Sequence, residues 1–302
     1  MRREIAIVGA PTSIGIRPYD DGRARRLDLA PAALREQGLV ARLAARDRGD
    51  VVSPPYRDLV RSGTRPRNEE EVATYSSALA RRVAAAAEGG AFVLVLGGDC
   101  SIVLGCLLGA RRPGAPTPGL AYVDAHADFG TPEESLTGSV ASMCLALAVG
   151  RGDTRLARLA DDGPLANAAD VALLARRDEA EPWYGHAALQ ASPVLDLPGA
   201  VLRRLGPEAV ARAALDRLTR PGSGGFWIHL DADVLDPTVV PAVDSPVSDG
   251  LGLTELEELI APLVRHPQAL GLELTIYDPS LDPDRTSAAR LTSLLERVLG
   301  PA

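Results

Sequence analysis

Short apolar runs alternate along the chain with longer segments of helical period. The runs are rich in branched and aromatic side chains, which is typical of strands buried in a sheet. They predict strands over residues 4–9, 92–96, 119–123, 170–175, 226–230 and 269–274. The Ala-, Leu- and Arg-rich segments between them predict helices over residues 31–46, 71–88, 101–111, 139–150, 207–219, 253–265 and 286–299.

Strands that alternate with helices indicate an α/β protein, here a three-layer α-β-α sandwich with a central, mainly parallel sheet. The Pro/Gly-rich stretches at 112–119 and 221–225 are short and lie between apolar runs, so we interpret them as loops rather than linkers. We therefore expect residues 1–302 to form a single domain.

Polar side chains gather where the predicted strands end. Ligands of parallel sheets bind beyond the carboxyl ends of the strands, which meet at one edge. The candidate site residues at that edge are Asp99, Cys100, Asp124, His126, Asp128, Asp231, Asp233 and Glu273.

Two runs in this set, Asp-Ala-His-Ala-Asp at 124–128 and Asp-Ala-Asp at 231–233, have the spacing of a metal cluster. Alternate residues of an extended chain project to the same side. The rise across the longer run is roughly 13 Å, too long for one ion unless the chain curls. Two ions about 3.5–4 Å apart would fit both runs. The alternative is a pair of acidic loops, but the repeated spacing and the interleaved histidine favour metal.

Composition narrows the function further. The 32 basic residues are all arginine, which excludes a Schiff-base lysine and the lysine of a phosphate-binding loop. A net charge of −8 and few aromatics argue against a nucleic-acid partner and suit a cationic small molecule. Three cysteines without Cys-x-x-Cys spacing, and no secretory or membrane-spanning segment, predict a cytoplasmic protein without a membrane partner.

The acidic runs are similar to signature segments of a known family. Gly-Gly-Asp-Cys-Ser at 97–101, the run at 124–128, and His-Leu-Asp-Ala-Asp-Val-Leu-Asp-Pro at 229–237 carry the likeness. They resemble the patterns Gly-Gly-Asp-His-Ser, Asp-Ala-His-x-Asp and Ser-x-Asp-x-Asp-x-x-Asp-Pro of the ureohydrolase superfamily of arginases, agmatinases and amidinohydrolases. The resemblance covers nearly the whole chain and implies an arginase-like fold and a homo-oligomer, either a trimer or a hexamer.

The resemblance also implies a ligand set for two divalent ions, usually manganese. Asp124 and Asp231 would bridge the ions, and the remaining ligands would be Cys100, His126, Asp128 and Asp233. An oxygen-rich set suits hard cations. In the reaction that the resemblance implies, a water acidified by both ions attacks a planar amidine or guanidinium carbon.

Other roles are implied in the same way. Asp128 would carry a proton to the leaving nitrogen, and Glu273 would accept hydrogen bonds from the guanidinium. Thr137 and Ser139 keep hydroxyls that could bind a substrate carboxylate. Asp244 stands where the family has small uncharged residues, and it either meets a second cationic group of the substrate or is a solvated loop acid.

The chain departs from the family pattern at Cys100, which replaces a histidine. A cysteine after a strand is most often a small buried apolar residue, but at a ligand position beside cations it would be deprotonated. We favour ligation, which would allow zinc, iron or another softer metal in place of manganese.

Two more departures argue against L-arginine as the substrate. Ala141 stands where arginases have an acid/base histidine. Residues 177–181, Arg-Asp-Glu-Ala-Glu, keep the first family acid, Asp178, as a substrate-binding candidate but place Ala180 where a contact to an α-amino group is expected.

The other histidines and cysteines have simpler interpretations. His229 is expected to be buried in the core or behind the ligands. His186, in a loop, is interpreted as surface structure or, alternatively, as a replacement for the missing histidine. His266 precedes a proline and is predicted to cap a helix. Cys106 and Cys144, on apolar helices, are expected to pack in the core.

These observations predict a binuclear metal-dependent hydrolase that cleaves a guanidino or amidino C–N bond of a small cationic metabolite and releases urea or an equivalent amide. The alternative is a catalytically silent relative that binds metal or ligand in a regulatory or assembly role. A deacetylase-like use of a similar site is weaker, because that chemistry relies on one zinc and paired histidines, and the chain has four histidines in all.

Overall fold

The computed structural model describes residues 3–57, 61, 63–181 and 185–300. Within these ranges eight strands form one sheet in the order β2-β1-β3-β8-β7-β4-β5-β6, and their pairings are parallel. The strands are β1 (Ile5–Gly9), β2 (Arg46–Asp50), β3 (Phe92–Leu96), β4 (Gly119–Val123), β5 (Val171–Leu174), β6 (Leu195–Leu197), β7 (Phe226–Asp231) and β8 (Ala269–Thr275).

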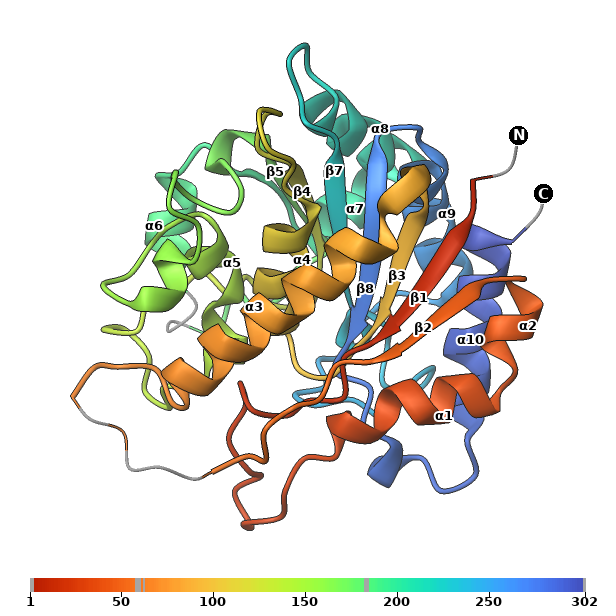
Figure 1. The fold of residues 1–302 in the computed structure, drawn as a ribbon, viewed down its shortest axis with the longest axis horizontal. Helices are drawn as coiled ribbons and strands as arrows, with labels where there is room; N and C mark the ends of the chain where they lie inside the picture. Colours follow the sequence, from red (N-terminus) through yellow and green to blue (C-terminus); the bar gives the residue numbers. More distant parts are fainter. Residues whose placement is uncertain (1–2, 58–60, 62, 182–184, 301–302) are drawn as a thin grey trace.

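Helices cover both faces of the sheet (Figure 1). In that view α3 and α4 cross in front of the strands, whereas α8 and α9 lie behind them, and α10 packs against α9. The helices are α1 (Ala30–Glu36), α2 (Leu39–Arg42), α3 (Glu69–Ala86), α4 (Ile102–Ala110), α5 (Cys144–Ala148), α6 (His186–Gln190), α7 (Gly199–Leu205), α8 (Pro207–Leu218), α9 (Leu253–Arg265) and α10 (Thr286–Leu299). The predicted three-layer α/β arrangement is confirmed.

The predicted strands all form, but two strands at the edges of the sheet were missed. β2 reads Arg-Asp-Arg-Gly-Asp and is largely exposed, and β6 is short and half-buried. An edge strand pairs on one side only and can face water, so it needs no apolar run. The sequence pattern that identifies buried strands is therefore absent from both.

The helix predicted over 31–46 is wrong in its C-terminal half. The chain breaks at Gly38, whose φ of +78° favours glycine, and it continues through α2 into β2. The segment predicted as a helix over 139–150 forms a 3₁₀ turn followed by the short helix α5. His266 is the C-cap residue of α9, as predicted.

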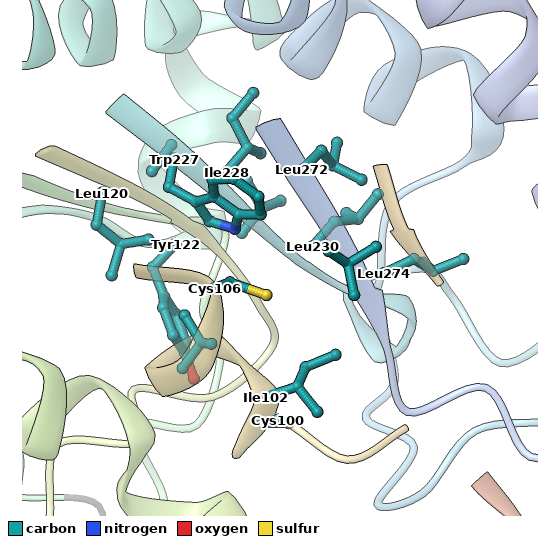
Figure 2. Close-up of a cluster of buried hydrophobic side chains, with 14 of the residues drawn as sticks. Cys100, Ile102, Cys106, Leu120, Tyr122, Trp227, Ile228, Leu230, Leu272 and Leu274 are labelled. Atoms are coloured by element: carbon teal, nitrogen blue, oxygen red, sulfur yellow. The ribbon is translucent and has the colours of Figure 1, made fainter. Parts of the chain in front are cut away.

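Buried side chains of the central strands pack beside α4. Figure 2 shows side chains of β4, β7 and β8 beside Cys106 of α4. Trp227 of β7 is almost fully buried because Gly271 of β8 leaves it room: a Cβ at that glycine would lie 2.4 Å from the ring. Cys106 and Cys144 are fully buried free thiols, as expected. No helix among the described residues has both the length and the apolar character needed to cross a bilayer.

Two glycines after β3 set the position of the site segment that follows. A Cβ at Gly97 would lie 2.3 Å from the carbonyl oxygen of Leu274, and a Cβ at Gly98 would lie 2.0 Å from that of Thr12. The close approach fixes Asp99, whose carboxylate accepts hydrogen bonds from the Gly15 and Ser101 N–H groups at 3.0 Å each. Asp99 therefore shapes this turn.

We predict that Gly98→Ala destabilises the protein by at least about 1–3 kcal/mol, because the backbone of the neighbouring loop must move to admit the methyl group. The measurement is the free energy of unfolding in urea. Gly199→Ala is the matched control, since a Cβ there meets its neighbours at 3.5 Å or more. Equal stabilities of the two variants would contradict the close packing of this turn.

Candidate metal centre

The first acidic run converges through a turn and not through strand alternation. β4 ends at Val123, so residues 124–128 lie beyond the sheet. The chain curls there: the His126 N–H donates to Asp124 Oδ1 at 2.7 Å, and Asp128 has a φ of +46°. The run is therefore curled and not extended, which is the alternative that its length left open, and the strand stops before its first candidate ligand. The curl brings the side chains together.

The second run begins inside the sheet. Asp231 is the last residue of β7, and a 3₁₀ turn over Ala232–Val234 follows it. The Asp233 N–H donates to Asp231 Oδ1 at 2.8 Å. The Ala125 N–H donates to Asp233 Oδ1 at 3.3 Å, which joins the second run to the first. The ends of β4 and β7 therefore hold both runs in one place, as their neighbouring positions in the sheet require.

The side chains form two groups of possible metal ligands that share one carboxylate. Within each group the ligand atoms lie within 4.8 Å of one another, and all are buried. The first group contains Cys100, Asp124, His229 and Asp231; the second contains Asp124, His126 and Asp233. Asp124 belongs to both groups, so it would serve both ions of a metal pair.

Individual distances support this grouping. Cys100 Sγ lies 3.0 Å from Asp231 Oδ2. His126 Nδ1 lies 3.1 Å from Asp233 Oδ2. Asp128 lines the same cavity but belongs to neither group, and its Oδ2 accepts a hydrogen bond from the Tyr122 hydroxyl at 2.7 Å.

The buried carboxylates repel one another. Burial, followed by the charges of Asp233 and Asp124, raises the pKa of Asp231 well above its usual value. Burial and Asp124 do the same to the pKa of Asp128. Two carboxylates about 4 Å apart repel by about 4 kcal/mol at an effective dielectric constant of 20. Divalent cations would remove this repulsion, and a set of oxygen, nitrogen and sulfur donors suits them. The residues present therefore fit a metal pair.

Sequence reasoning missed His229 as a possible ligand. The residue is fully buried, its ring stacks on that of Tyr122 at 4.1 Å, and its Nδ1 lies 2.8 Å from Glu273 Oε1. Its Nε2 faces Asp124 Oδ2 at 3.7 Å and has no hydrogen-bond partner among the described residues. Burial lowers the pKa of His229, but the two neighbouring carboxylates outweigh burial and raise this pKa to about 10. The available signal was alternation: His229 lies two residues before Asp231, on the same face of β7.

Glu273 does not lie where the sequence placed it. β8 continues to Thr275, so Glu273 is inside the strand, fully buried beside His229, and does not line the cavity. The residue after β8 that does line it is Ile276, which has a φ of +67° and donates its N–H to the carbonyl of Gly98 at 2.9 Å. The placement of Glu273 thus gives no support to a guanidinium-binding role.

A cavity of about 320 Å³ opens onto the metal-ligand groups. Beyond these groups its wall includes Arg17, Arg25, Thr137, Ser139, Ala141 and Asp244. Asp244 is only 5% exposed and lies 2.6 Å from Arg25 Nε, so it is not a solvated loop acid.

Asp178 lies outside the cavity wall. Asp178 is 2% exposed, and its carboxylate accepts hydrogen bonds from Arg176 Nη1 at 3.1 Å and from the Ala127 N–H at 2.7 Å. His186 Nε2 lies 3.2 Å from the same carboxylate, at the start of α6. Residues 182–184, which precede it, lie outside the described residues. Asp178 thus holds the turn at residues 124–128 through its bond with Ala127. Its placement does not favour contact with a substrate.

The fold and the site together define an α/β protein with a candidate two-ion centre at the carboxyl edge of its sheet. Comparisons with known proteins agree. The profile of the Arginase family matches residues 3–300. Arginase from Bacillus subtilis (strain 168) is 30% identical over 308 residues, which cover 99% of each chain. The solved structure of arginase from Bacillus caldovelox matches with a TM-score of 0.86 at 28% identity and covers 99% of each chain.

The chain therefore belongs to the arginase family. It is a hydrolase of the class that acts on C–N bonds in linear amidines. Formimidoylglutamase from Bacillus subtilis shares the fold, with a TM-score of 0.75 at 19% identity, 98% of this chain and 86% of that chain being covered. Members of the family usually bind a binuclear metal site, and the two ligand groups are the candidate for it here.

We predict that manganese raises the Tm of the metal-stripped protein by several degrees, because it binds only the folded carboxylate cluster. Asp231→Asn should abolish this rise and lower the metal content. Without metal, the same variant should be no less stable than the natural chain, since it removes a like charge. Differential scanning calorimetry and elemental analysis test this.

Asp216→Asn is the control for that experiment, because Asp216 is exposed on α8. If Asp231→Asn kept both ions and the full rise in Tm, the assignment of the cluster as a metal centre would be wrong.

Proposed function

We propose that the protein is a binuclear metal hydrolase that cleaves a guanidino or amidino C–N bond of a small metabolite and releases urea or an equivalent amide. The observation that carries this proposal is the pair of ligand groups joined through Asp124 and facing a cavity, in a chain of the arginase family. When bound, two divalent ions supply an acidified water and an electrophilic centre. Manganese is the proposed native metal.

The chain's own residues hold the substrate and move protons. Asp128 lines the cavity with Oδ2 fixed by Tyr122, which orients the other oxygen for proton transfer to the leaving nitrogen. The burial of the ligand groups excludes bulk water and strengthens electrostatic contacts with the reacting group. Ala141 and Ile276 are apolar parts of the same wall, so neither can transfer a proton.

L-arginine is not the substrate that this cavity favours. Ala141 lines the wall where arginases have the acid/base histidine, and the acid of the following segment, Asp178, is held away from the cavity by Arg176. The silent alternative is less favoured, because the ligand groups are intact and open onto a cavity. We also propose a homo-oligomer, as the resemblance implies, and a cytoplasmic location, which follows from the cysteine content and the lack of a predicted secretory segment.

We predict that the manganese-loaded protein releases urea from a guanidino compound other than L-arginine. Asp128→Asn should lower kcat by about 10²–10⁴-fold, the usual contribution of a positioned acid or base, whereas Asp216→Asn should leave it unchanged. Colorimetric assay of urea across guanidinobutyrate, agmatine, hydroxyarginine and arginine tests this. The silent alternative would be the better description if metal-loaded protein released no urea from any of them.

Position 100 tests the metal preference separately. Cys100→His should shift the bound metal toward manganese and reduce inactivation by peroxide, because an imidazole replaces an oxidisable sulfur. Cys106→Ser, on the buried face of α4, is the control for loss of a thiol elsewhere. Elemental analysis that found the same metals bound to the Cys100→His variant as to the natural chain would exclude Cys100 as a ligand.

A further inference from the structure

The acids that the sequence assigned to a cationic substrate are already paired within the chain. Each has an internal cationic or imidazole partner: Asp178 with Arg176, Glu273 with His229, and Asp244 with Arg25. Among the described residues of the cavity wall, the only carboxylate outside the expected ligand set is Asp244. The wall therefore offers no unpaired carboxylate to a second cation on the substrate.

Arg25 is a fixed cation in that wall. Its side chain is about nine-tenths buried, with 10% exposed. Asp244 Oδ1 accepts from Nε at 2.6 Å, the carbonyl of Arg17 accepts from Nη1, and the ring of Tyr19 lies 4.2 Å from the guanidinium carbon. These contacts hold the guanidinium on three sides, and no hydrogen bond of Nη2 is recorded among the described residues.

Hydroxyl donors continue the wall from Arg25. The Arg17 N–H donates to Ser139 Oγ at 3.2 Å, and the Ser139 N–H donates to Thr137 Oγ1 at 3.2 Å. A hydroxyl oxygen that accepts from the backbone still has its own proton to donate. Within the part of the chain that the structure describes, neither hydroxyl has a recorded acceptor. Arg25, Ser139 and Thr137 are thus hydrogen-bond donors linked through Arg17 on one side of the cavity.

We propose that Arg25 determines specificity, and that the substrate carries an anionic group, such as a carboxylate, at the end opposite its amidino or guanidino group. This inference rests on the proposed function. A charge-assisted hydrogen bond from a preorganised guanidinium is among the stronger polar contacts, and the adjacent hydroxyls complete a set of donors for a carboxylate. Asp244 is then a positioning residue that holds Arg25, and not a receptor for a substrate cation.

Guanidinobutyrate and agmatine separate the two possibilities, because they share a guanidino group and end in a carboxylate and an ammonium group, respectively. We expect the manganese-loaded full-length protein to bind guanidinobutyrate at least about tenfold more tightly than agmatine, which corresponds to about 1.4 kcal/mol. Isothermal titration calorimetry measures binding without requiring turnover, and the urea assay then reports KM and kcat.

The matched variants test the role of Arg25. Arg25→Gln should erase the preference by weakening the binding of guanidinobutyrate about tenfold. Its effect on the KM for guanidinobutyrate should be larger than its effect on kcat. Arg25→Lys, which retains the charge, should restore part of it. Arg212→Gln, at an exposed position of α8, is the control for the loss of one arginine and should change nothing. Thermal unfolding of each variant establishes that it is folded.

Asp244→Asn gives results of opposite sign for the two roles. If Asp244 positions Arg25, the variant still prefers the carboxylate compound, its KM for guanidinobutyrate rises severalfold, and its affinity for agmatine does not fall. If Asp244 binds a substrate cation, the affinity for agmatine falls instead, and the inference is overturned.

Three other outcomes also overturn it: agmatine bound as tightly as guanidinobutyrate, a preference that survives in Arg25→Gln, or binding of neither compound at millimolar concentration. A carboxylate preference without urea release from any guanidino compound would support the anion site and count against the proposed hydrolase. Urea release with a preference for agmatine would support the proposed hydrolase and count against the anion site.

Discussion

Mutual repulsion among buried aspartates is the constraint on which the rest of this structure depends. Asp124, Asp128, Asp231 and Asp233 are each at most 4% exposed, at one edge of the sheet. Carboxylates so close raise the free energy of the folded chain unless positive charge neutralises them. In the protein alone, His126 and His229 supply part of that charge, and their proximity outweighs burial and lowers the pKa of Asp124. Bound divalent cations would remove the remaining repulsion, which is why the cluster is the candidate metal centre. A core that buries the central strands almost completely provides the stability needed to hold such a cluster together.

How much of the fold the sequence predicts depends on burial. The central strands β3, β4, β7 and β8 are identified by their apolar runs, because both of their faces are covered by helices. The edge strand β2 has no such run, and its residues look like the end of a helix until their pairing with β1 is known. Pairing between strands distant in sequence is tertiary information, and local hydrophobicity does not carry it.

Prediction of the candidate site from the sequence is limited in the same way, because it also depends on tertiary structure. Residue type and spacing identify the acidic runs, but the curl of 124–128 comes from a strand that ends at Val123 and from a residue, Asp128, in the left-handed region. Glu273 was misplaced for a related reason: β8 is longer than its apolar run, so a residue expected at the strand end lies two residues inside. The exact end of a strand decides which side chain reaches the cavity, and sequence patterns locate strand ends poorly.

Internal pairing of acids changes what the overall charge of the chain means for its substrate. A net charge of −8 suggests an affinity for cations. However, when an acid is buried against an arginine, the guanidinium neutralises its charge, and the acid attracts a nearby ligand cation only weakly. At the cavity wall the unit that a ligand meets is therefore the Arg25–Asp244 pair with its adjacent hydroxyls, whose outward groups are donors. Long-range attraction of a cation and short-range selection of an anion are compatible in one molecule, because the first follows the total charge and the second follows the orientation of a few buried groups. A substrate with a cationic amidine at one end and an anion at the other satisfies both requirements.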